Sequence, residues 1–225
     1  MPKQLDFLAI GDITTDAFIR LKEAEVHCDI DRKNCQLCVR FADKIPYEFV
    51  EVIRAVGNSP NAAVAAARLG LSAGLVTNMG DDENGLECLA ALKKEKVETA
   101  YVSVHKGAKT NYHYVLWFED ERTILVKHEE YPYKLPAIEP APKWIYCSSL
   151  GGSSEQYHYE LIGYLEKHPE VRLAFQPGTF QIKQGIETLK RLYQKTEVFF
   201  CNTDEARRLL KSSSTDPLTL LKGLQ

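Results

Sequence analysis

The sequence predicts an α/β fold with a mainly parallel sheet and a small β appendage. Apolar strand-like runs alternate with amphipathic helical segments from Lys143 onward, and such alternation is typical of βαβ units. Two stretches, 17–56 and 101–127, are strand-like and break this alternation. We therefore expect both stretches to form one β appendage outside the main sheet.

Composition places the chain among ordinary globular proteins. It has 225 residues, 44% hydrophobic and 26% charged, with a formal charge of −3, so we expect a single domain over 1–225. The slightly acidic balance argues against nucleic acid and anionic membranes as partners, and no apolar stretch reaches the ~18 residues of a membrane span. Asp6 interrupts the region where a signal peptide is apolar. We expect a cytoplasmic protein whose six cysteines are reduced or bind metal.

The individual elements follow from local patterns. Leu5–Ile10 is an apolar run that ends at a turn, as a buried strand does. Ser59 as N-cap, Pro60 at the first helical position and an Ala-rich run up to Gly70 predict a helix. The further expected strands are Ser72–Thr77, Trp144–Cys147, Val171–Phe175 and Glu197–Cys201, and the further helices are Glu83–Lys96 (capped by Asp82), Glu155–Lys167, Ile182–Gln194 and Thr203–Lys211.

The first candidate site is the turn Gly11–Asp16 after the opening strand. In parallel α/β folds, ligands bind outside the carboxyl ends of the strands, and Thr14 and Asp16 would face that crevice. A carboxylate there can accept hydrogen bonds from two hydroxyls of a polyol. The alternative is a solvated turn with a local Asx-type cap.

The second candidate is the segment Val56–Ala63. Gly57 allows close approach of the backbone just before a helix N-terminus. Asn58 and Asn61 offer both donors and acceptors, which suit neutral hydroxyls better than phosphate. The alternative is a capped helix without a ligand.

The third candidate is Asn202-Thr203-Asp204-Glu205 at the end of a strand. Asn202 and Glu205 have the spacing of a capping box, which would stabilise a helix without further function. The functional alternative is that Glu205 points toward a cluster of Mg²⁺ and phosphate, directly or through water.

Taken together and in this order, the three segments and Gly80–Gly85 resemble the ribokinase-like (PfkB) carbohydrate kinase family over residues 5–211. The resemblance implies a three-layer ribokinase-like α/β domain, with 17–56 and 101–127 forming a β lid that covers a sugar. It also implies transfer of the ATP γ-phosphate to a sugar hydroxyl with Mg²⁺, and a homodimer paired through the lid.

The resemblance also assigns residues to the two sides of the site. Three departures from the family pattern affect the sugar side: Val56 replaces the first of two glycines, Thr14 stands where ribokinases often carry Asn, and Asn58 stands where they carry Lys. The last change favours an unphosphorylated substrate. The implied sugar-binding residues are Asp16, Gly57, Asn58, Asn61, Thr14 and the lid residue Thr110, and the implied Mg²⁺-phosphate residues are Asn202 and Glu205.

One family motif has no counterpart in the printed sequence. Family members carry D-T-x-G-A-G-D, whose last Asp is the catalytic base and whose glycine amides hold the transferred phosphate. The chain thus resembles the N-terminal two-thirds of such a kinase, C-terminally incomplete and without a catalytic residue of its own. We expect no sugar turnover by these 225 residues. The alternative is a non-catalytic sugar-binding or assembly module.

Neither G-x-G-x-x-G nor G-x-x-x-x-G-K-[ST] occurs, which argues against a Rossmann oxidoreductase and a P-loop NTPase.

A separate cluster lies within the insert 23–46. His27, Cys28, Cys35 and Cys38 supply four nitrogen and sulfur ligands, as a structural Zn²⁺ needs. The spacing between Cys28 and Cys35 is unlike that of common zinc fingers, so unligated cysteines are the default and zinc is the alternative. A redox C-x-x-C is less favoured because no adjacent helix lowers a thiol pKa. Cys88, Cys147 and Cys201 are expected to be core residues.

Overall fold

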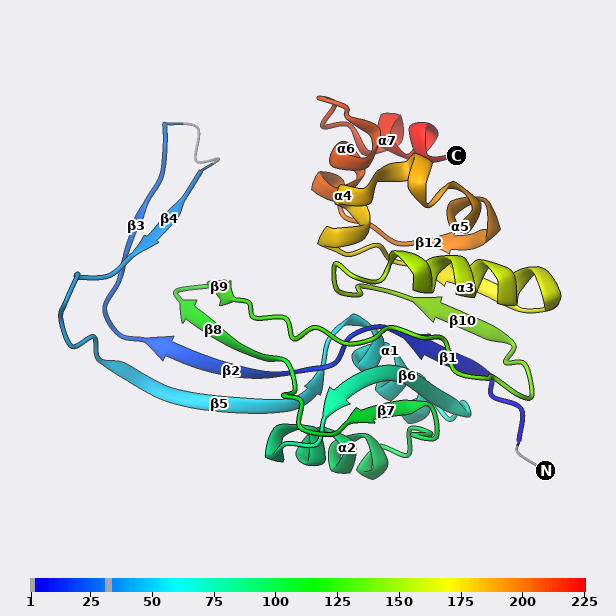
Figure 1. The fold of residues 1–225 in the computed structure, drawn as a ribbon. Coiled ribbons are helices and arrows are strands. Elements are labelled where there is room, and N and C mark those ends of the chain that lie inside the picture. Colours follow the sequence, from blue (N-terminus) through cyan, green and yellow to red (C-terminus); the bar gives the residue numbers. More distant parts are fainter. Residues whose placement is uncertain (1–2, 31–33) are drawn as a thin grey trace.

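A six-stranded parallel sheet forms the centre of the molecule (Figure 1). A computed structural model describes residues 3–30 and 34–225. The strand order is β12-β11-β10-β1-β6-β7, so the first strand lies between segments from both halves of the chain. The strands are β1 (Phe7–Ile10), β6 (Ala73–Gly80), β7 (Val102–His105), β10 (Trp144–Cys147), β11 (Arg172–Phe175) and β12 (Thr196–Phe199).

Helices cover both faces of this sheet, as a parallel sheet requires. Because side chains alternate along a strand, β1 contributes Leu8 and Ile10 to one core and Ala9 to the other. The core containing Ala9 includes α1 (Asn58–Arg68) and α2 (Glu83–Lys94), and the other includes α3 (Glu155–Lys167). The three-layer α/β prediction is confirmed. The remaining helices are α4 (Thr179–Thr188), α5 (Lys190–Lys195), α6 (Thr203–Leu210) and α7 (Pro217–Leu224).

Two helix predictions need correction. Ser59 is not the N-cap of α1 but lies inside the helix. Its hydroxyl does not cap the helix and donates instead to the backbone oxygen of Ile10 at 2.7 Å. Gly57 precedes the helix instead. The expected helix Ile182–Gln194 is divided into α4 and α5, and Gly185 inside α4 has a φ of +83°, a conformation that glycine adopts without penalty.

A separate four-stranded sheet, the lid, extends from one end of the central sheet (Figure 1). Its order is β5-β2-β8-β9, and the parallel pair β2–β8 joins the two distant stretches of chain. The expected lid boundary at residue 101 is wrong, because β7 pairs with β6 in the central sheet. The lid strands are β2 (Thr14–Leu21), β5 (Tyr47–Val56), β8 (Tyr112–Phe118) and β9 (Glu121–Leu125).

A two-stranded hairpin projects from the lid, away from the main body (Figure 1). It consists of β3 (Glu25–His27) and β4 (Gln36–Cys38). A disulfide joins Cys28 to Cys35. Neither sulfur is therefore a free thiolate ligand, so the zinc alternative at His27, Cys28, Cys35 and Cys38 is wrong, as is the expectation that these two cysteines are reduced. Among residues 3–30 and 34–225, no helix is long and apolar enough to cross a membrane.

Candidate functional site

The carboxyl ends of the parallel strands meet along one edge of the central sheet, where β1, α1 and β10 join closely. The hydroxyl of Ser59 lies 2.6 Å from that of Ser148, and both are buried. A Cβ on Gly11 would lie 2.6 Å from each of these oxygens. Only glycine fits at this junction, so the start of α1 sits directly beside the turn that follows β1.

The structure brings Gly57 against that same turn. Its φ is +128°, and a Cβ there would lie 2.8 Å from the backbone oxygen of Asp12. Asn58 and Asn61, in the first turn of α1, are exposed. Thr14 is buried, and its hydroxyl donates to the Thr15 backbone oxygen at 3.2 Å. The glycine and the turn thus form one wall, while the two amides face outward.

Asp16 lies on β2, on the face of the lid that carries His113 of β8. The carboxylate oxygen Oδ1 is 3.4 Å from Nδ1 of His113, and both side chains are largely buried. Within the described part of the chain, Oδ1 of Asp16 has no hydrogen-bond partner. An unsatisfied acceptor on this face of the lid is available to a ligand hydroxyl.

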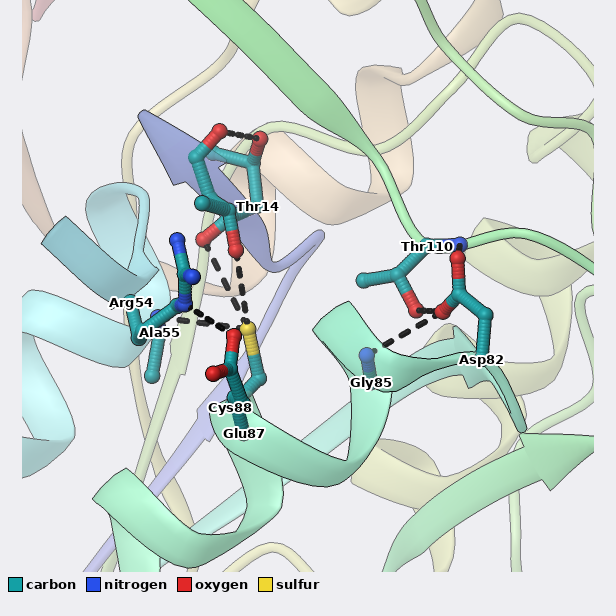
Figure 2. A network of polar contacts seen from close by, with 9 residues as sticks. Thr14, Arg54, Ala55, Asp82, Gly85, Glu87, Cys88 and Thr110 are labelled. Carbon is teal, nitrogen blue, oxygen red and sulfur yellow. Dashed lines mark hydrogen bonds and ion pairs between the residues drawn. The ribbon is translucent and has the colours of Figure 1, made fainter. Parts of the chain in front are cut away.

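Thr110 has a structural contact that its family position does not reveal. Its buried hydroxyl donates to Asp82 Oδ1 at 2.6 Å and accepts a bond from the Gly80 amide at 3.1 Å, as Figure 2 shows in part. Asp82 also caps α2 through the Gly85 amide. Burial favours the neutral acid, but the bonds from Thr110 and Gly85 outweigh it and hold the pKa of Asp82 below its ordinary value. Thr110 therefore anchors the start of β8 to α2.

Cys88 of α2 makes a second anchor for the lid (Figure 2). Its sulfur accepts a hydrogen bond from the Ala55 amide at 3.3 Å and lies 3.4 Å from the Thr15 hydroxyl. Cys88 and Cys147 are buried, as expected for core residues, and burial raises the pKa of both thiols. Cys201 is only half-buried, because it follows the edge strand β12. Helix α2 thus fixes the base of β2 and β5.

Asp12 is a site residue that the sequence analysis did not single out. Both of its carboxylate oxygens accept bonds from the Tyr133 hydroxyl, at 2.8 and 3.0 Å, and the Gly151 amide donates to the same hydroxyl. Desolvation raises the pKa of Asp12 to about 6, against the opposing effect of these bonds. The only sequence signal is its place directly after the first strand.

Asn202 and Glu205 form the capping box at the start of α6. The Asn202 side chain accepts from the Glu205 amide at 2.8 Å, and Glu205 Oε2 accepts from the Asn202 amide at 2.9 Å. Both follow β12, three strands from β1 along the carboxyl edge, a span of about 14 Å. Over the described ranges, no hydrogen bond involves Glu205 Oε1, which leaves one oxygen for a hydrated cation. Among residues 3–30 and 34–225, no group of three or more acidic, His or Cys side chains is suited to hold a metal ion.

The fold and these contacts define an α/β protein whose polar carboxyl edge lies beside an anchored lid. Residues 38–225 match the sequence pattern described as pfkB family carbohydrate kinase. The chain belongs to this family, and its fold is ribokinase-like. No curated protein matches the chain.

Solved structures show the same fold at low sequence identity. Ribokinase from Arabidopsis thaliana, complexed with ribose and ATP, matches with a TM-score of 0.75 and 13% sequence identity, covering 99% of this chain and 68% of that one. Ribokinase from Cryptococcus neoformans in complex with ADP matches with a TM-score of 0.69 and 20% identity, covering 97% of this chain and 65% of that one. Fructokinase from Halothermothrix orenii matches with a TM-score of 0.68 and 20% identity, covering 98% of this chain and 76% of that one. The chain therefore spans about two-thirds of the length of the two ribokinases.

Proposed function

We propose that this chain binds a sugar or sugar-like substrate at the carboxyl edge beneath the lid, as part of an ATP-dependent carbohydrate kinase. The observations that carry the proposal are the junction of Gly57 with the turn at Asp12 and the unsatisfied oxygen of Asp16 on β2, which pairs with the strand that leads into Gly57. A close backbone approach and a carboxylate acceptor suit a ligand that is recognised through hydroxyls. The family membership supports the reaction class.

The sugar-side residues have distinct roles in this proposal. Asp16 accepts hydrogen bonds from substrate hydroxyls, and the exposed amides of Asn58 and Asn61 bind further hydroxyls as donors or acceptors. Gly57 provides space for the substrate. Thr14 and Thr110 act through the wall and the lid anchor, because their hydroxyls already bond to protein atoms.

The nucleotide side lies at the start of α6. Asn202 and Glu205 would hold Mg²⁺-ATP, with Glu205 Oε1 directed to the hydrated ion. Their chemistry fits, since Mg²⁺ keeps several waters and needs one or two carboxylates beside the phosphates. The ion would neutralise charge on the phosphates. ADP and ATP are bound in the two ribokinase structures, and we extend nucleotide binding to this chain on the basis of the shared fold.

We further propose that the printed 225 residues bind sugar without phosphorylating it. Phosphoryl transfer depends on positioning and electrostatic stabilisation, and the sequence contains no G-A-G-D segment to provide a base and an anion hole. The second candidate is a non-catalytic sugar-binding or assembly module, which sugar binding without ATP turnover would favour.

Calorimetry and an ADP-release assay test both parts. We expect D-ribose or D-fructose to bind the wild-type chain, and Asp16→Ala to weaken binding by about tenfold or more because a charged acceptor is lost. With ATP and Mg²⁺, no ADP is expected. Absence of sugar binding contradicts the substrate assignment, whereas sugar-dependent ADP release contradicts the proposed inactivity.

A further inference from the structure

His113 lies beside Asp16 on the lid but is not one of the residues that the family resemblance identifies. In the parallel pair β2–β8, it is the register partner of Asp16. Its Nδ1 lies 3.4 Å from Asp16 Oδ1, and only 14% of its side chain is exposed. The imidazole and the carboxylate therefore sit side by side on one face of the lid.

Both side chains carry a buried polar atom that lacks a hydrogen bond. These atoms are Oδ1 of Asp16 and Nε2 of His113, and neither has a partner within residues 3–30 and 34–225. Buried polar atoms are normally satisfied, and leaving one unpaired costs free energy. Two such atoms on neighbouring residues indicate a site whose partners come from outside the protein.

Two aromatic rings close this part of the lid against the main body. The ring of His113 packs edge-on against His128, with centroids 5.7 Å apart, and His128 packs against Phe180 of α4 at 5.5 Å. Desolvation, and secondarily the nearby His113, lowers the pKa of His128, which favours its neutral form. The His128 ring therefore covers one side of His113 and links the lid to α4.

We propose that His113 is a specificity-determining residue that contacts the substrate and, together with Asp16, selects two adjacent hydroxyls of a neutral sugar. This inference rests on the proposed function. Asp16 accepts a hydrogen bond from one hydroxyl, and His113 Nε2 exchanges a hydrogen bond with its neighbour. A vicinal diol fits because each hydroxyl both donates and accepts.

The charge of the site favours a neutral substrate over a sugar acid. Asp16 would repel a carboxylate placed beside it. The nearby cation Arg54 is bonded to Glu87, and Asn58 has no charge to offer an anion. Among the described residues Arg54 Nη1 has no hydrogen-bond partner, but Glu87 offsets the charge of Arg54. A substrate anion would therefore meet no unneutralised cation among these neighbours of the site.

Matched substitutions at His113 separate a substrate contact from a packing role. Gln places its amide near the position of Nε2, whereas Phe keeps the ring shape but has no polar atom. We expect His113→Gln to keep affinity for the preferred neutral sugar and His113→Phe to reduce it by about tenfold. His168→Gln, at an ion pair with Glu170 beyond the end of α3, is the control and should leave sugar affinity unchanged.

Calorimetry of the full chain would use D-ribose, 2-deoxy-D-ribose, D-fructose, D-gluconate and adenosine, with melting curves to verify folding. We expect a neutral sugar to bind best, and D-ribose to exceed its 2-deoxy analogue by about tenfold in wild type but not in His113→Phe. Equal affinity of wild type and a folded His113→Phe, or preference for D-gluconate, would overturn the inference alone. Absence of binding by every probe would overturn the proposed function together with it.

Discussion

Asp12 shows how a residue in an ordinary turn acquires unusual chemistry. The Tyr133 hydroxyl comes from the proline-rich connector after the lid and bonds both carboxylate oxygens. Burial outweighs these bonds and raises the pKa to about 6. The folded state therefore binds a proton to Asp12 more tightly than the unfolded chain does, so Asp12 stabilises the fold most in acid.

This sign gives a direct prediction for pH dependence. Below about pH 4, Asp12 is protonated in both states, and between about pH 4 and 6 its contribution to stability is lost. Asp12→Asn should therefore raise the free energy of unfolding at pH 7 by about 3 kcal/mol and have little effect at pH 4. Urea denaturation of both proteins across this range measures the difference.

Asp6 provides the opposite case for comparison. Bonds from Lys143 and Ser72 hold its pKa well below the ordinary value. Asp6→Asn should therefore destabilise the protein at pH 7, and this effect should fade as the pH falls below about 4. If both variants shift stability in the same direction at pH 7, the assignment for Asp12 is wrong.

Sequence reasoning found residues whose chemistry is local and missed those defined by contacts across the chain. Asp82 and the pair Asn202–Glu205 cap helices three residues away, so spacing alone predicts them. Asp12 and His113 depend on Tyr133 and Asp16, which are distant in sequence. No local pattern carries that information.

At the scale of elements, regular helices were predictable to within a residue or two. Helix α3 has the predicted bounds Glu155–Lys167 because its apolar stripe is continuous. The expected helix Ile182–Gln194 divides because Gly185 adopts a positive φ that the apolar pattern does not reveal. The strand β7 was assigned to the lid, although it pairs with β6 in the central sheet. This prediction failed because strand character alone does not specify a pairing partner.

The start of α2 makes the coupling between helix and lid measurable. Asp82→Ala removes the cap to Gly85 and the partner of Thr110 at once. We expect a loss of about 1 to 2 kcal/mol in the free energy of unfolding. Glu83→Ala, at an exposed neighbour without a capping bond, should cost only a few tenths. Equal losses in chemical denaturation would contradict the capping role.

The hairpin makes a prediction about thiol chemistry. With Cys28 joined to Cys35, the other four of six cysteines are free. Alkylation in denaturant without reductant should therefore add four groups by mass spectrometry, and all six should react after reduction. Cys28→Ser should give five without reductant, because its partner is released. Six groups on the unreduced wild-type chain would contradict the disulfide.

At the scale of the whole molecule, the lid is a candidate surface for the homodimer that the family resemblance implies. Strand β5 exposes apolar side chains, with Val50 and Val52 on one face at 45% and 40% exposure. Placing Glu at both positions should convert a dimer to a monomer, since two buried charges oppose association. Leu86→Glu, an equally apolar exposed site on α2, should leave the mass unchanged. Light scattering after gel filtration distinguishes these outcomes, and a monomeric wild type contradicts the dimer.

The parallel pairing of β2 with β8 also constrains the order in which a growing polypeptide acquires its shape. On a ribosome, β2 and β5 emerge first and pair with each other, but β2 finds its other neighbour only after residues 112–118 have been synthesised. Until then, one edge of β2 has unpaired amides and carbonyls that other nascent chains can bind. Translation speed over the 55 residues between β5 and β8 thus sets how long this edge is exposed to aggregation.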